Sequence, residues 1–209
     1  CTVGCEDRLF SKDYSFYAYA EQKGYGYFLS EVKDFFTEDD LTVANFEGVF
    51  KDTLYDAVDK TYCFRGLPEF AQILTLGGID AVSLANNHTG DYGTKGKIST
   101  KQALDAAGVA TFGYDETYLF EKDGIKIGFC GFYGVGFNKR SEIAAIVKSL
   151  KEKGANAVVC FLHFGDEYAD YHNRTQIKVA RLVVDAGADL VVGSHPHVVQ
   201  GVEAYRERT

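Results

Sequence analysis

The stretch that decides the fold reads Ala188-Asp189-Leu190-Val191-Val192-Gly193-Ser194-His195-Pro196-His197. Its Val-rich start is typical of a buried parallel strand, and α/β folds bind ligands just beyond the carboxyl ends of such strands. In an extended segment, residues i and i+2 point to the same side, so we expect both imidazoles to face one site, with Pro196 keeping the backbone extended. The stretch predicts an α/β protein with a site at this strand end. Two histidines in a surface turn are the alternative.

Three further polar clusters follow apolar runs in the same way. They are Asn45-Phe46-Glu47-Gly48, Asn86-Asn87-His88 and His163-Phe164-Gly165-Asp166-Glu167. Four of the five histidines lie in the four clusters. Imidazole together with amide and carboxylate oxygen suits a divalent transition metal, so the pattern indicates a scaffold for a metal site.

The first two of these clusters supply oxygen ligands and a proton donor. Glu47 is the best candidate for an anionic ligand, although a solvated loop glutamate would look the same. An Asn87 amide oxygen can coordinate the metal, and the adjacent His88 could protonate a leaving oxygen. Asp91 could cap the next helix or fix the tautomer of His88.

The third cluster and one arginine complete the candidate site. His163 is a third imidazole ligand, and Glu167 could orient His163 as an acceptor or cap the following helix. Arg65 could clamp a phosphate or carboxylate, but an arginine in this setting is more often a surface residue.

Composition bounds the class of protein. The 209 residues are 46% hydrophobic and 25% charged, which favours one soluble α/β domain over 1–209. A net charge of -8 excludes the basic footprint of a nucleic-acid binder and gives no polybasic patch for an anionic membrane. The five cysteines are odd in number, and Cys130 and Cys160 lie in apolar runs, which favours buried thiols over a disulfide framework.

Helical and strand patterns alternate along the chain. Helices are predicted over 27–36, 68–77, 97–107, 141–153 and 174–186. Strands are predicted over 41–46, 80–85, 109–112, 157–162 and 189–192, with a hairpin of 118–120 and 125–132 around Asp123-Gly124. The segment between 46 and 64 is predicted to be rich in loops, and the aromatic residues of 14–27 are expected to pack an edge of the core.

The four motifs together, with Asp91-Tyr92-Gly93 and Gln200-Gly201, resemble the CapA family of bacterial capsule and poly-γ-glutamate synthesis proteins, which is similar to the calcineurin-like metallophosphoesterases. The resemblance covers nearly the whole chain. It implies a four-layer α-β-β-α sandwich, truncated at both ends because the family's opening Gly-Asp and its closing strands are missing.

The resemblance also implies roles for single residues. Metal ligands would be Asn87, His163, His195 and His197, and His88 would be catalytic, with Asp91 beside it. The bridging carboxylate of the metallophosphoesterase pattern would fall near Asn45 or Glu47; we expect Glu47 to bind metal, and Asn45, Arg65 and Glu167 to contact substrate. One or two divalent ions are expected, and the sequence does not distinguish Mn, Fe and Zn.

Three functions follow as hypotheses. The first is a capsule or poly-γ-glutamate biosynthesis protein whose metal cleft hydrolyses a phosphoester or a polymer amide bond. The second is a non-catalytic polymer-handling subunit of a capsule synthesis or export complex, and the third is a generic metal-dependent phosphodiesterase. The resemblance implies an anionic polymer or phosphoester substrate, capsule synthesis subunits as partners, and a place on the extracytoplasmic face of the membrane through an anchor outside this chain.

Overall fold

A computed structural model of the protein describes residues 3–134 and 139–206. The chain divides into two compact units, residues 1–111 (unit 1) and 112–209 (unit 2). Each unit combines β-sheet with α-helices, as expected of an α/β fold. That the two units make one domain stays a prediction.

The first sheet of unit 1 carries two of the polar clusters. It is formed by β2 (Val43–Asn45), β5 (Ala81–Ser83) and β6 (Ala110–Phe112) in the order β2-β5-β6. Strands β2 and β5 are parallel, and Asn45 lies opposite Ser83 at their carboxyl ends. Parallel register therefore brings the segments after both strands, 46–48 and 84–91, to the same edge of the sheet.

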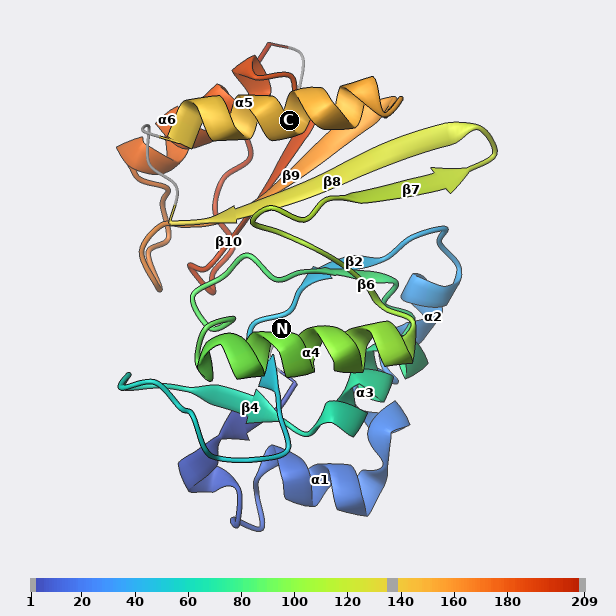
Figure 1. Ribbon diagram of the computed structural model, residues 1–209, viewed down its shortest axis with the longest axis vertical. Coiled ribbons are helices and arrows are strands. Elements are labelled where there is room, and N and C mark those ends of the chain that lie inside the picture. The colour runs from blue at the N-terminus through green and yellow to red at the C-terminus, as the bar shows by residue number, and fades with distance from the viewer. Residues whose placement is uncertain (1–2, 135–138, 207–209) are drawn as a thin grey trace. The chain divides into compact units, whose positions relative to one another are not determined.

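A second sheet of unit 1 contains β1 (Cys5–Glu6), β4 (Phe64–Gly66) and β3 (Val49–Phe50) in the order β1-β4-β3. Helix α4 (Gly93–Ala107) lies between the two sheets (Figure 1). The Thr100 hydroxyl of α4 accepts a hydrogen bond from the Phe50 amide (2.9 Å). A Cβ at Gly96 would lie 3.0 Å from a Val49 methyl, so a glycine at this position lets α4 approach β3 closely.

The remaining helices of unit 1 are short, and the aromatic and aliphatic core of this unit includes Phe46, Phe70 and Leu104. They are η1 (Asp7–Leu9), α1 (Phe16–Lys23), η2 (Tyr25–Tyr27), α2 (Lys33–Thr37), η3 (Pro68–Phe70) and α3 (Ala71–Leu76). The Ser15 hydroxyl caps α1 by accepting from the Ala18 amide (3.1 Å).

Unit 2 is built on one four-stranded sheet in the order β10-β9-β8-β7. Its strands are β7 (Tyr118–Lys122), β8 (Ile125–Tyr133), β9 (Ala157–His163) and β10 (Leu190–Ser194). The β7–β8 hairpin turns at Asp123 and Gly124, which both have positive φ as a type I′ turn requires. The other two pairings are parallel, which places Ser194 opposite His163.

Helices α5 (Arg140–Glu152) and α6 (Arg174–Asp185) cover one face of this sheet (Figure 1). Their apolar sides pack on β8 and β9 in a core that includes Val147, Val158 and Val183. Cys130 and Cys160 lie opposite each other in this core as buried thiols, as the sequence predicts. Burial, together with the neighbouring Cys130, raises the pKa of the Cys160 thiol well above its usual value.

Most predicted elements of 68–194 are found within a few residues of their predicted bounds, whereas the N-terminal third differs. The helix predicted over 27–36 is wrong, because only Lys33–Thr37 is α-helical and the residues before it form turns. The sequence reading also missed α1 and the short strands β3 and β4. Among the described helices, none has the length and hydropathy needed to cross a bilayer.

Candidate metal centre

In unit 2, two histidines meet at the carboxyl ends of β9 and β10. His163 is the last residue of β9 and is buried, and its Nδ1 lies 2.9 Å from the hydroxyl of Ser194, the last residue of β10. The ring centroids of His163 and His195 are 4.7 Å apart. The predicted convergence of these two polar clusters follows directly from the parallel register.

Hydrogen bonds from backbone and side-chain donors hold the loops after β9 and β10 together. The Phe164 amide donates to the Ser194 carbonyl (3.1 Å), and the Tyr168 amide donates to the Pro196 carbonyl (2.7 Å). The Gln200 side chain donates to the Ala169 carbonyl (2.7 Å). The two loops therefore form one connected structure at the edge of the sheet.

Within these loops, Glu167, His195 and His197 each offer a ligand atom, and the three atoms lie within 4.8 Å of one another. Two imidazole nitrogens and a carboxylate oxygen form a donor set suited to Zn, Mn or Fe, so these residues fit the divalent ion that the sequence predicts. A divalent metal at this edge is thus supported by donor chemistry, while the identity of the metal stays open among these three.

The backbone of 195–197 differs from the prediction. Strand β10 ends at Ser194, and His195 and His197 have φ values of 100° and 58°, so the segment turns instead of running extended. The donor atoms of both histidines still converge, because the turn redirects them. Tyr168, in the facing loop, also has positive φ (60°). Non-glycine residues in this region are strained, and such strain concentrates at ligand-binding sites.

Glu167 does not cap the helix that follows it. The helix that follows, α6, is capped by Asn173, whose side chain accepts from the Thr175 and Gln176 amides (2.9 and 3.0 Å). The prediction that Glu167 caps this helix is therefore wrong. Its carboxylate lies instead near the donor atoms of His195 and His197.

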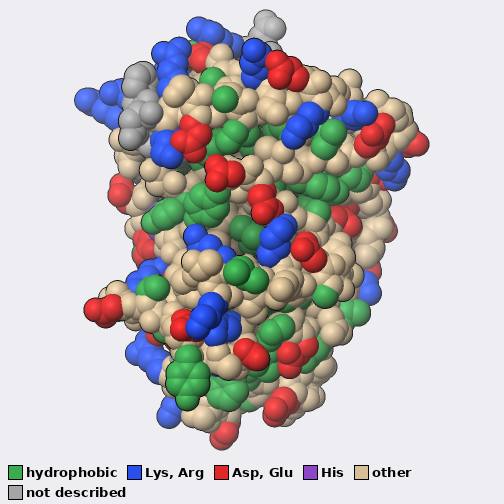
Figure 2. Space-filling model, viewed as in Figure 1, with side chains coloured by type: hydrophobic (Ala, Val, Ile, Leu, Met, Phe, Trp, Pro, Cys, Tyr) green, Lys and Arg blue, Asp and Glu red, His purple; other side chains and the backbone are tan. Residues whose placement is uncertain are grey.

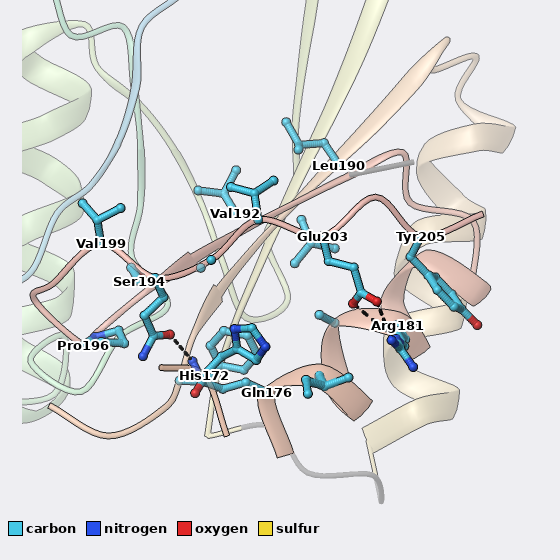
Figure 3. A pocket seen from close by; sticks show the side chains of 18 of the residues that line it. His172, Gln176, Arg181, Leu190, Val192, Ser194, Pro196, Val199, Glu203 and Tyr205 are labelled. Atoms are coloured by element: carbon cyan, nitrogen blue, oxygen red, sulfur yellow. Dashed lines mark hydrogen bonds and ion pairs between the residues drawn. The ribbon is translucent and has the colours of Figure 1, made fainter. Parts of the chain in front are cut away.

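A cavity of about 540 Å³ adjoins this edge of unit 2, between α6, β10 and the segment 196–205 (Figure 3). Its walls are mainly apolar, with valines from β10 and the segment. Two side-chain pairs bridge it: Gln176 donates to Gln200 (3.0 Å), and the Arg181 guanidinium pairs with Glu203. Ser194 and Pro196 line the cavity but the three donor residues do not, so it is a neighbour of the candidate metal centre.

In unit 1, Asn86 organises the residues after β2 and β5. Its side chain is buried; the amide nitrogen donates to Asn45 Oδ1 (3.1 Å) and to the Phe46 carbonyl (2.7 Å). Its oxygen accepts from the amides of His88 and Thr89 (3.0 Å each). Asn86 therefore fixes the position of His88 relative to the 45–47 segment.

Asn45 and Glu47 are in direct contact. The Asn45 amide donates to Glu47 Oε2 (3.0 Å), and Glu47 is buried. Asn45 thus orients the carboxylate of Glu47 two residues on. Its predicted contact with substrate stays a prediction, as does metal binding by Glu47.

His88 and Asp91 form a hydrogen-bonded pair. His88 Nδ1 lies 2.7 Å from Asp91 Oδ2, and both residues are buried. Since a carboxylate only accepts, Nδ1 carries the proton and Nε2 is the nitrogen left for chemistry. Asp91 thus fixes the His88 tautomer, whereas the alternative, a cap on α4, is wrong because the N-cap of that helix is Tyr92.

Lys60 is a member of this cluster that the sequence reading missed. Its Nζ lies 2.9 Å from Asp91 Oδ1, 2.9 Å from the Asn87 carbonyl and 3.3 Å from His88 Nδ1. It comes from the predicted loop, where no local pattern distinguishes one lysine from another. Lys60 ties this loop to the Asn87-His88 motif.

Arg65 is buried inside unit 1 and is not the surface residue that its sequence setting suggested. Its guanidinium donates to the Lys51 carbonyl (2.8 Å) and lies 5.5 Å from the Phe10 ring centroid. These contacts give Arg65 a packing role in unit 1. Its part in substrate binding stays a prediction that the function proposed below does not need.

The fold is that of known α/β proteins. The chain is similar to a hypothetical protein from Thermus thermophilus (TM-score 0.51, 20% identity, 88% of this chain and 66% of that one). It is also similar to NAD nucleotidase (NadN) from Haemophilus influenzae (TM-score 0.53, 16% identity, 88% of this chain and 39% of that one). These likenesses confirm the predicted α/β fold class.

Sequence comparison then assigns the chain to one family of proteins. The chain belongs to the family described as bacterial capsule synthesis protein PGA_cap, whose profile matches residues 7–209. Relatives include the PGA biosynthesis protein CapA of Bacillus subtilis (31% identity, 88% of this chain, 54% of the relative) and the capsule biosynthesis protein CapA of Bacillus anthracis (28%, 88% and 51%). The chain spans about half the length of these relatives.

Proposed function

We propose that this chain is a metal-dependent hydrolase of capsule or poly-γ-glutamate biosynthesis, acting on a phosphoester or amide bond of an anionic polymer. Membership of the family supports the biosynthetic setting. The observation that carries the metal dependence is the cluster of donor atoms from Glu167, His195 and His197.

The proposed ligands are Glu47, Asn87, His163, His195 and His197, for one or two divalent ions. The convergence of Glu167 with the last two histidines adds a carboxylate to this set. A divalent ion held by these residues would polarise a phosphoryl or carbonyl oxygen as a Lewis acid. A carboxylate such as that of Glu167 offsets the charge of the ion, which histidine and asparagine alone would not do.

His88 is the proposed general acid. Because Asp91 holds Nδ1, the protonated imidazole directs its Nε2 proton away from Asp91, where a leaving oxygen can receive it. The Asp91 carboxylate holds the imidazole ring in the orientation that this transfer needs, as in other histidine–carboxylate pairs. Lys60 holds Asp91 and the Asn87 carbonyl in place, so it supports both the acid and the neighbouring ligand.

The experiment combines metal analysis with turnover. The purified chain is loaded with Mn²⁺ or Zn²⁺, desalted and analysed for bound metal, then assayed on a model phosphodiester and on poly-γ-glutamate. We compare His195→Ala/His197→Ala, His88→Ala and, as matched control, His172→Ala at the exposed histidine outside the four clusters. We expect the double variant to lose metal and turnover, and His88→Ala to keep metal but lose at least about 100-fold in rate.

Two outcomes contradict the proposal. A chain that binds no metal at all would overturn the hydrolase, and full turnover by His88→Ala would remove the role given to that residue. Metal binding without any turnover would favour the second candidate function, a polymer-handling subunit. The name of a Mycobacterium tuberculosis relative, "Probable polyglutamine synthesis accessory protein", favours that candidate (24% identity, 81% of this chain and 53% of the relative).

The setting in the cell is part of the same proposal. We place the protein at the extracytoplasmic face of the bacterial membrane, held by an anchor outside this chain and working with other subunits of capsule synthesis. Protease treatment of intact cells tests the location: an extracytoplasmic protein is expected to be degraded while a cytoplasmic marker survives. Protection of both proteins would contradict this placement.

A further inference from the structure

Unit 1 contains a second, unrelated cavity of about 630 Å³. It lies beside α1, between that helix, the segment 10–13 before it and the start of η3. On the visible surface of unit 1 around α1, hydrophobic and acidic side chains lie close together (Figure 2). A cavity of this size can hold a small organic molecule.

One wall of the cavity is aromatic. Phe10, Tyr17, Tyr25 and Phe70 all line it. Their rings follow one another in contact, with centroids 4.2 Å apart for Phe10 and Tyr17, 5.2 Å for Tyr17 and Phe70, and 5.5 Å for Tyr25 and Phe70. Aromatic faces carry negative electrostatic potential and attract cations.

The same rings already contact a cation of the chain. The Arg65 guanidinium lies 5.5 Å from the Phe10 centroid and 5.8 Å from the Tyr17 centroid. The Tyr17 hydroxyl donates to the Arg65 carbonyl (2.8 Å), which fixes this ring in the wall. These contacts hold Tyr17 in the wall and show that the rings of Phe10 and Tyr17 have a cationic neighbour.

The polar part of the lining is acidic. Asp13, Glu21 and Glu69 contribute three carboxylates, and Lys12 contributes one ammonium. Within the described part of the chain, these three carboxylates form no ion pair. Tyr25 reports their influence: its pKa lies above the usual value, first because of burial and then because Glu69 and Glu21 oppose the phenolate charge.

We propose that this cavity is a binding site for an alkylammonium group, with the aromatic wall facing the cation and the carboxylates at its rim supplying the opposite charge. A purely apolar ligand would make no use of the carboxylates. A small hard metal ion would make no use of the rings, since it requires several oxygen ligands in direct contact. The proposal is independent of the metal centre and of the hydrolase function.

Choline and its uncharged carbon analogue 3,3-dimethylbutan-1-ol, which have the same shape, test the proposal on the unmodified chain. Binding is followed by titration calorimetry and by shifts of backbone amide signals in NMR spectra. We expect choline to bind at least about tenfold more tightly than the alcohol and to shift the amides of 10–25 and 67–70. Equal binding of the two compounds, or binding of neither, would overturn the proposal.

Two variants locate the site. Tyr25→Leu and Glu69→Gln are each expected to weaken choline binding about tenfold or more. Glu31→Gln, at an exposed acid that does not line the cavity, is the matched control and is expected to leave binding unchanged. Choline binding that survives both cavity variants would assign it to another surface and overturn the proposal. Thermal unfolding of each variant shows that it is folded, and the choline–alcohol comparison does not depend on any variant.

Discussion

At the residue scale, one amide side chain connects the two polar clusters of unit 1. The sequence places Asn86 in an asparagine-rich turn, next to the candidate ligand Asn87. In the structure both ends of its amide are used, toward Asn45 and Phe46 on one side and toward His88 and Thr89 on the other. Asparagine suits this position because a single short side chain offers a donor pair and an acceptor.

Asn86→Ala is expected to lower the free energy of unfolding by about 2–4 kcal/mol, because it leaves several buried polar groups without their partners. Urea denaturation monitored by circular dichroism measures the change. Asn87→Ala is the matched control; its side chain is more exposed, so we expect a smaller effect on stability. Equal losses in both variants would show that Asn86 does not organise the turn.

At the element scale, the sequence predicted those helices and strands that are determined by hydrophobic periodicity and by the turn residues that bound them. The parallel strands β9 and β10 were found because apolar runs bounded by turn residues identify buried strands. Their register then fixed the meeting of His163 with the 194–197 segment. The strands β3 and β4 have two and three residues and are defined by tertiary pairing, so no local pattern marks them. Lys60 was missed for the same reason, because its contacts are tertiary and no local pattern marks it. The turn at His195 and His197 could not be predicted, because histidine rarely adopts positive φ.

The segment 196–205 has no regular secondary structure, and an ion pair holds part of it in place. Glu203 pairs with Arg181 of α6, and the guanidinium lowers the pKa of this carboxyl below its usual value. A carboxyl with a lowered pKa stabilises the folded state above the pH at which it titrates in the unfolded chain, and the contribution is lost as the pH falls through the folded pKa. Acid should therefore loosen this segment first.

Hydrogen exchange of the amides of 198–205 tests this prediction. We expect protection of these amides at pH 7, corrected for the intrinsic exchange rate, to fall between about pH 5 and pH 3, while that of β9 stays constant. In Glu203→Gln, protection of these amides should already be low at pH 7 and should stay low at acidic pH. A segment whose protection does not change with pH in the parent chain would contradict a role for this ion pair.

At the scale of the whole molecule, net charge affects how the chain binds its proposed anionic substrate. A protein with a net charge of -8 repels an anionic polymer at long range, so contact depends on local positive charge such as a bound divalent ion. Salt screens this repulsion, since the Debye length falls to about 8 Å at physiological ionic strength.

Affinity for poly-γ-glutamate in the presence of divalent metal is accordingly expected to rise, or at least not to fall, as NaCl increases from about 20 to about 200 mM. Fluorescence anisotropy of labelled polymer measures the trend, and removal of metal with a chelator should abolish binding. A basic binding surface would give the opposite trend, a steep loss of affinity with salt. That result would remove the metal-centred account of polymer binding.

Because the backbone is left-handed at residues 195 and 197, thermal stability and ligand binding favour different residues at these two positions. Glycine adopts this conformation without the side-chain clash that costs about 1–2 kcal/mol in other residues, so replacing either histidine with glycine relieves strain while deleting a donor. A directed-evolution screen that scored thermal survival alone should therefore enrich glycine or asparagine at these two positions. The histidines would persist only under selection for what they bind.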